Sequence, residues 1–164
     1  MNIDYILDGF NRREVAFLLV GGMNFMLRHT PTLTFDLDLW IEDIPANLAR
    51  CEQALAELDA AWGASEADWG PVARRAPGWL GAQSVFFLTS PHGAIDIFRE
   101  LRGLADWQTC RARAVPVITA TGVQCYGLAD EDMLLSQLAL DPAEQKPDRI
   151  RVLQAALKGK ACFL

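Results

Sequence analysis

Two aspartates, Asp36 and Asp38, lie within the apolar run FDLDLWI of residues 35–41. Burying an ionised carboxylate in such a run is costly unless the group is paired, hydrogen-bonded or bound to a metal ion. Side chains alternate between the two faces of a strand, so both acids are expected on one face together with Trp40. The opposite face is apolar and is expected to pack into the core: Phe35, Leu37, Leu39 and Ile41.

A third acid, Asp96, repeats this pattern in the run GAIDIFR of residues 93–99. Three carboxylates on neighbouring strands would form an oxygen-rich site, and such sites suit Mg²⁺ or Mn²⁺ rather than Zn²⁺. Asp36 and Asp38 are about 6–7 Å apart at Cα in a strand, so their oxygens can converge on one ion or bridge two. We therefore predict that Asp36, Asp38 and Asp96 bind a divalent cation and act in catalysis.

A glycine pair, Gly21 and Gly22, separates an apolar strand expected at residues 16–20 from a short helix expected at residues 23–29. Glycines at such a junction let the backbone approach a phosphate and offer it N–H groups at a helix N-terminus. A phosphate cradle beside a metal-binding acidic cluster is what an enzyme needs to bind a nucleoside triphosphate (NTP) and activate its α-phosphate for in-line attack.

The remaining pattern predicts an α/β protein with a small mixed β-sheet flanked by α-helices, in one domain that covers residues 1–164. Apolar residues at helical spacing predict helices, and short apolar or alternating runs predict strands. Further helices are expected at residues 2–14, 45–62, 103–114, 130–140 and 147–159. Strands are expected at residues 16–20, 35–41, 84–90, 93–99, 115–118 and 123–126, and residues 63–82 are expected to form a long irregular loop.

Composition argues against several classes of function. No apolar run approaches the ~20 residues that a membrane span needs, and the first residues are acidic where a signal peptide is basic, so we expect a cytoplasmic protein without membrane contact. The net charge of −6 and the pI near 4.8 argue against sequence-independent nucleic-acid binding. The four cysteines form no CxxC pair and are expected to be reduced: Cys51, Cys110, Cys125 and Cys162.

Three segments, VGGMN (residues 20–24), TFDLDL (residues 34–39) and AIDIF (residues 94–98), resemble the motifs of the polymerase-beta-type nucleotidyltransferase superfamily. That pattern is a glycine pair, a short helix, an Asp-x-Asp strand and a third acid on a neighbouring strand. Among its branches, the chain is most similar to the minimal AbiEii-like group, the type IV toxins of abortive-infection systems. The late segment of residues 128–153 is also similar to that group.

The resemblance assigns nucleotide binding to residues of the glycine pair, the short helix, the acidic strand and the late segment: Gly21, Gly22, Asn24, Arg28, Thr34, Lys146 and Asp148. Two positions depart from the pattern, because Thr32 and Gln137 stand where the family often has basic residues. Arg28 is expected to substitute for the missing cation.

The resemblance implies a Mg²⁺- or Mn²⁺-dependent transferase that moves a nucleoside monophosphate from an NTP to an acceptor. The resemblance does not identify the acceptor, which could be a tRNA end, a protein side chain or a small molecule. Membership of the toxin branch would imply an antitoxin partner. Two alternatives remain. One is a resistance enzyme that adenylylates an aminoglycoside or lincosamide antibiotic, and the other is a non-catalytic relative that binds a nucleotide or a partner protein.

Overall fold

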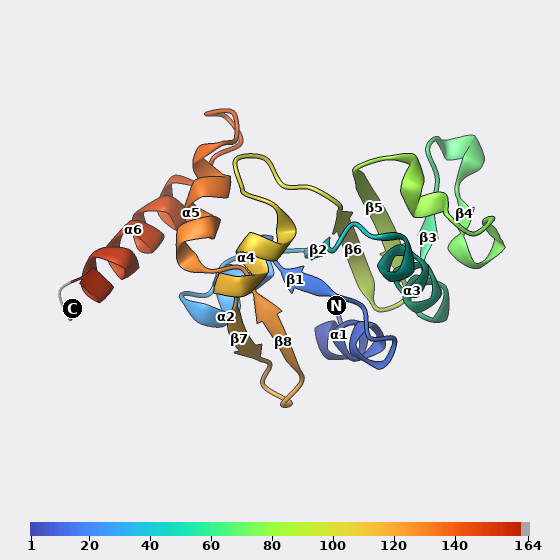
Figure 1. Ribbon diagram of the computed structural model, residues 1–164, viewed down its shortest axis with the longest axis horizontal. Coiled ribbons are helices and arrows are strands. Elements are labelled where there is room, and N and C mark those ends of the chain that lie inside the picture. Colours follow the sequence, from blue (N-terminus) through green and yellow to red (C-terminus); the bar gives the residue numbers. More distant parts are fainter. Residues whose placement is uncertain (162–164) are drawn as a thin grey trace.

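A computed structural model describes residues 1–161, in which strands and helices are mixed along the chain. In chain order the elements are α1 (Ile3–Arg12), β1 (Phe17–Leu19), α2 (Gly21–Arg28), β2 (Asp36–Ile41), α3 (Pro45–Glu57), β3 (Ala61–Trp62), β4 (Gly70–Pro71), β5 (Val85–Ser90), β6 (Gly93–Phe98), α4 (Trp107–Arg113), β7 (Val115–Ile118), β8 (Gln124–Gly127), α5 (Asp130–Leu138) and α6 (Pro147–Ala161) (Figure 1). This order confirms the predicted α/β class.

The eight strands found within residues 1–161 form one mixed sheet in the order β4-β3-β5-β6-β2-β1-β8-β7. β2 runs parallel to β6 and β1 runs parallel to β8, whereas the other neighbours are antiparallel. Because β2 and β6 are neighbours, the acidic strand lies directly beside the strand that carries Asp96.

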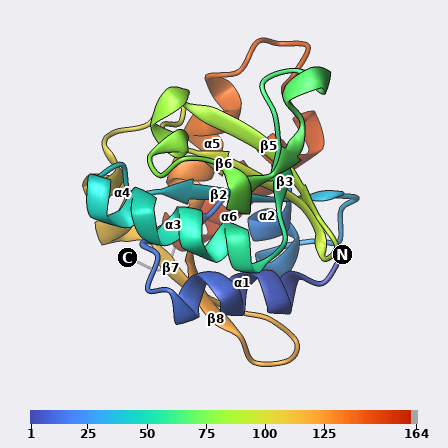
Figure 2. The same ribbon diagram turned by 90° about the vertical axis from the view of Figure 1, so that its right-hand side faces the viewer.

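Helices cover both faces of the sheet. α1 and α3 lie side by side on one face, as Figure 2 shows, where Phe10 and Leu55 join the larger core with Leu37 of β2. α4, α5 and α6 pack over the other face, where Met133 and Leu153 join a second core. The acidic residues of β2 therefore face the side of the sheet that α4, α5 and α6 only partly cover.

The helix predicted at residues 45–62 is too long. α3 ends at Glu57, and Asp59 takes a left-handed backbone conformation with φ of +52°. The chain then turns back so that Ala61 and Trp62 form β3, which pairs with both β4 and β5. Strand pairing with a distant segment thus outweighs the local helix propensity of this alanine-rich stretch.

The helix predicted at residues 103–114 is too long at its start. α4 begins at Trp107, because the Asp106 carboxylate accepts a hydrogen bond of 3.0 Å from the Thr109 N–H and caps the helix. The loop predicted at residues 63–82 contains β4 and three short 3₁₀-helices. Trp79 in this loop stacks on Trp62 with 5.6 Å between ring centroids, so part of the loop belongs to the core.

The prediction for the two faces of β2 was wrong for Phe35 alone among the residues it named. Phe35 precedes the strand and is 74% exposed, not in the core. Trp40 lies on the same face as the two acids, as predicted, where it is buried in the second core and donates through Nε1 to the Arg99 carbonyl at 3.2 Å. Its burial arises because α4 covers this end of the strand, where Trp107 donates to the Trp40 carbonyl.

Three cysteines are buried free thiols: Cys51, Cys110 and Cys125. The prediction for Cys162 lies outside the described residues. No helix in the described part of the chain is both long enough and apolar enough to cross a membrane.

Candidate active site

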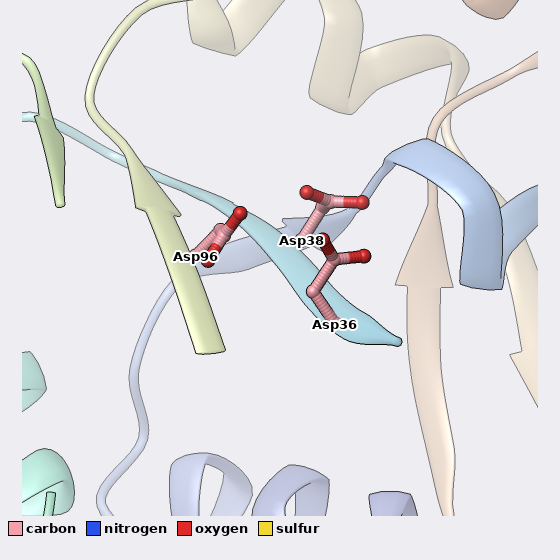
Figure 3. A group of neighbouring side chains, drawn as sticks. All are labelled: Asp36, Asp38 and Asp96. Carbon is pink, nitrogen blue, oxygen red and sulfur yellow. The ribbon is translucent and has the colours of Figure 1, made fainter. Parts of the chain in front are cut away.

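The structure brings the three predicted acids together on one face of the sheet (Figure 3). Parallel pairing of β2 with β6 sets Asp38 beside Asp96, and Asp36 lies two residues earlier on the same face of β2. One carboxylate oxygen of each residue lies within 4.8 Å of the others. Within the described residues, this is the only group of three or more His, Cys, Asp or Glu side chains close enough to share one ion.

Burial and mutual repulsion raise the pKa values of two of these acids. Burial, followed by the Asp36 charge, raises the pKa of Asp38 from 3.8 to about 6, although a Gly22 N–H and Arg149 oppose the shift. Burial, followed by the charges of Asp38 and Asp36, raises the pKa of Asp96 to about 7. A cation between the three carboxylates would relieve this repulsion.

The donor set fits a hard divalent cation. All three side chains offer carboxylate oxygens, which are the ligands that Mg²⁺ and Mn²⁺ prefer, and no thiolate or imidazole is in the group. Thr34 supports the arrangement because its hydroxyl donates to Asp36 Oδ1 at 3.1 Å and so restrains that carboxylate. Asp36, Asp38 and Asp96 are therefore the residues that could bind the predicted Mg²⁺ or Mn²⁺.

The glycine pair begins α2 directly against the acidic strand. A β-carbon at Gly21 would lie 1.8 Å from Asp38 Oδ2, and Gly21 also has a left-handed φ of +61°. A β-carbon at Gly22 would lie 2.7 Å from Thr34 Oγ1, and the Gly22 N–H donates weakly to Asp38 Oδ2 at 3.4 Å. Glycine is thus required at both positions for the N-terminus of α2 to approach the carboxylates this closely.

Arg149, in the first turn of α6, lies beside the acidic cluster and was not predicted from the sequence. Its Nη2 atom lies 3.4 Å from the position that a β-carbon of Gly22 would take, and its guanidinium stands over the Phe25 ring. Burial lowers the pKa of Arg149, whereas the charges of Asp38 and Asp36 oppose that shift. The sequence spacing could have indicated this position. Arg149 precedes the fully buried Leu153 by four residues, so both lie on the inner face of α6.

Lys146 and Asp148, the residues predicted in this segment, lie at the rim of a cavity of about 650 Å³. The Lys146 N–H donates to Gln137 Oε1 at 3.1 Å, and the exposed Asp148 pairs with Arg151 at 2.9 Å. Arg149 and Arg151 also line this cavity, together with residues 30–33 of the loop before β2. The structure therefore gathers three cations on the side of the acidic cluster where α6 begins.

Asn24 and Arg28 direct their polar groups away from the acidic cluster. Asn24 Nδ2 donates to the Leu128 carbonyl at 2.9 Å, and Arg28 donates to the same carbonyl at 2.7 Å. Arg28 also pairs with the buried Asp130 at 2.6 Å, and His29 contacts the same carboxylate oxygen at 2.9 Å. Residues 24 and 28 are four apart and share a helix face, so these contacts attach α2 to the start of α5.

A second, smaller cavity of about 230 Å³ lies on another side of Asp38. Its lining includes the apolar Phe98, Leu101 and Leu140, and its polar members besides Asp38 are Arg102, Ser136 and Gln137. The acidic cluster thus lies between a cation-rich cavity and a smaller one of mixed lining.

No protein-family model matches the chain, and no curated protein matches it in sequence. Several solved structures are similar to it in fold, among them the following two. TM1012 of Thermotoga maritima, provisionally assigned as a nucleotidyltransferase, is 15% identical with a TM-score of 0.56, and the match covers 97% of this chain and 90% of that one. ANT(2″)-Ia, solved with adenylyl-2″-tobramycin, is 14% identical with a TM-score of 0.61, covering 97% of this chain and 89% of that one. The chain therefore has the fold of these nucleotidyltransferase structures.

Proposed function

We propose that this protein is a divalent-metal-dependent nucleotidyltransferase that moves a nucleoside monophosphate from an NTP to a hydroxyl acceptor. One observation carries the proposal: Asp36, Asp38 and Asp96 place carboxylate oxygens within 4.8 Å of one another beside the N-terminus of α2. The shared fold supports it, because both matches to nucleotidyltransferase structures cover 97% of this chain.

The two cavities suggest how an NTP would bind. Phosphates carry the charge of an NTP, so they belong in the cavity lined by Lys146, Arg149 and Arg151. The N–H groups of Gly21 and Gly22 at the start of α2 would add hydrogen bonds to phosphate oxygens. The base and ribose would then occupy the smaller cavity on the other side of Asp38.

The acids have separate tasks in this proposal. Asp36 and Asp38 would hold the divalent ion, with Thr34 restraining Asp36, and Asp96 would complete the site from the neighbouring strand. A bound Mg²⁺ supplies charge neutralisation at the reacting phosphate. Arg149 would neutralise phosphate charge from the side opposite the metal ion. It would therefore supply the cation that the sequence led us to expect from Arg28.

A labelling experiment tests the proposal. The protein is incubated with Mg²⁺ and each α-³²P-labelled NTP in turn, together with total tRNA, a cell protein extract, or a panel of aminoglycosides and lincosamides. We expect label to be transferred to one acceptor class and Asp38→Ala to abolish it, since phosphoryl transfer depends on metal-assisted charge stabilisation. Asp8→Asn, which removes an exposed carboxylate on α1, should leave the labelling unchanged.

The labelled fraction separates the narrower hypotheses. Label on tRNA would favour the AbiEii-like toxin, for which an antitoxin partner is then expected, and label on an antibiotic would favour a resistance enzyme. Nucleotide binding without transfer to any acceptor would refute the transferase and favour the non-catalytic relative. The likeness to ANT(2″)-Ia concerns the fold and does not select among these acceptors.

A further inference from the structure

An exposed phenylalanine extends the acidic face of the sheet by one strand. In the antiparallel register of β5 and β6, Phe87 lies opposite Asp96, which in turn lies beside Asp38 on β2. These three side chains thus form a row across three adjacent strands. Phe87 is 63% exposed, whereas its neighbours Phe86 and Leu88 turn to the opposite face and are buried.

The two strands that carry Phe87 and Asp96 hold no other charged residue, and Arg102 lines the cavity beside Asp38 and Phe98. Arg99, which directly follows β6, pairs with Asp43 at 2.9 Å and donates to backbone carbonyls of residues 80–83. A ligand on this surface would therefore meet an apolar ring beside a negatively charged cluster.

The direction of the reaction assigns this surface to the acceptor. In an in-line displacement the attacking oxygen and the leaving pyrophosphate lie on opposite sides of the reacting phosphorus. If the phosphates occupy the cavity lined by Lys146 and Arg149, the attacking oxygen must come from the other side of the cluster. That side is the row formed by Asp96 and Phe87.

Charge and exposure restrict the chemistry of the acceptor. An RNA end needs several cations to neutralise its phosphates, whereas β5 and β6 offer none and Arg102 is the one cation in the lining of the neighbouring cavity. Small-molecule sites are concave and enclose most of their ligand, which does not fit a phenylalanine that is 63% exposed on a strand. An exposed aromatic side chain on the face of a sheet is instead typical of protein interfaces, in which aromatic residues are enriched.

We propose that the acceptor is a hydroxyl side chain of a partner protein, presented on a neutral or basic surface whose apolar residues pack on Phe87. The inference rests on the proposed nucleotidyltransferase function. The acceptor oxygen forms a bond to the α-phosphorus of the NTP, and the bond from that phosphorus to the bridging oxygen breaks. Pyrophosphate leaves with the bonding electron pair, and the hydroxyl proton is released to solvent.

Synthetic acceptors of opposite charge test this inference. The full chain with Mg²⁺ and α-³²P-labelled NTP is offered a lysine–tyrosine copolymer, a glutamate–tyrosine copolymer, total tRNA or tobramycin. We expect label on the lysine–tyrosine copolymer, with at least about tenfold lower kcat/KM for Phe87→Ala, as at an interface hot spot. Phe87→Trp, which keeps an aromatic side chain, should retain most of the wild-type kcat/KM. The matched control Ile118→Ala removes an exposed strand residue on β7 and should not alter the kinetics.

The outcomes separate this inference from the function on which it rests. Three results would overturn the protein-acceptor inference without contradicting the transferase function. They are transfer to tRNA or tobramycin, equal labelling of both copolymers, and labelling that Phe87→Ala does not change. A wild-type protein that binds Mn²⁺ and NTP but labels none of these acceptors would refute the transferase itself, and the acceptor inference with it.

Discussion

Replacing Asp38 by asparagine should stabilise the metal-free protein at neutral and alkaline pH. The pKa of Asp38 rises from 3.8 in an ordinary environment to about 6 in the folded protein. That shift of about two units corresponds to about 3 kcal/mol of unfavourable free energy for the ionised form, at ~1.36 kcal/mol per unit. Asparagine retains part of the burial cost and solvent screens the half-buried site, so we expect a net gain of about 1–2 kcal/mol.

The gain has a defined pH dependence. Because the folded pKa is raised, the native state binds more protons than the unfolded state between about pH 4 and pH 6, and wild-type stability falls as pH rises through that window. Below it, Asp38 is protonated in both states and the mutation should be nearly neutral. The raised pKa of Asp96, about 7, extends the decline of wild-type stability to higher pH.

Thermal unfolding in EDTA measures this effect. At about pH 8 the Asp38→Asn protein should melt roughly 2–8 °C above wild type, given about 2–4 °C per kcal/mol for a chain of this size. Near pH 4 the two should coincide. Asp8→Asn, on the exposed surface of α1, serves as control and should change stability by no more than ~0.5 kcal/mol. A loss of stability at pH 8, or an equal gain at both pH values, would refute the electrostatic reasoning.

Three other substitutions test the surroundings of the acidic cluster. Gly22→Ala should lower transferase labelling at least about tenfold, because its β-carbon would lie 2.7 Å from a threonine hydroxyl, whereas Gly159→Ala enters open space and should leave labelling unchanged. Asp130→Asn should reduce the urea-measured free energy of unfolding by about 2–4 kcal/mol, because it removes the negatively charged partner of the mostly buried Arg28. The exposed Asp148→Asn should change it by less than ~0.5 kcal/mol, and equal effects would contradict the assignment. Arg149→Gln should weaken equilibrium binding of a fluorescent NTP analogue about tenfold or more, since a charged hydrogen bond to phosphate is lost; unchanged affinity would exclude a phosphate contact.

The sequence predicted the acidic cluster because its determinants are local. Asp36 and Asp38 are two residues apart in one strand, and the apolar residues around Asp96 mark a second strand of the same kind. The local pattern does not show that β2 and β6 are neighbours in the sheet. That part of the prediction depended on the resemblance to a known family. The glycine pair was equally predictable, because two glycines between an apolar strand and a short helix indicate a close approach of the backbone to neighbouring groups.

Features that depend on distant packing were not predictable from the sequence. The stretch that ends in Ala61 and Trp62 has helix-forming composition, and it becomes a strand only because β5 and β4 pair with it. Arg28 looked like a phosphate ligand, but the start of α5 supplies Asp130 as its partner. Arg149 reaches the acids only through the docking of α6, which depends on the burial of Leu153.

Binding of Mn²⁺ to the acidic cluster is the most direct test of the central claim, and isothermal titration with a non-hydrolysable NTP analogue measures it. The structure places three carboxylate oxygens within 4.8 Å of one another, so wild type should bind Mn²⁺ together with the analogue. Asp36→Asn/Asp38→Asn should remain folded and lose that binding, because two of the three anionic ligands become neutral amides. Absence of binding to wild type, or equal binding to the double mutant, would contradict the assignment of this cluster as a metal-dependent active site.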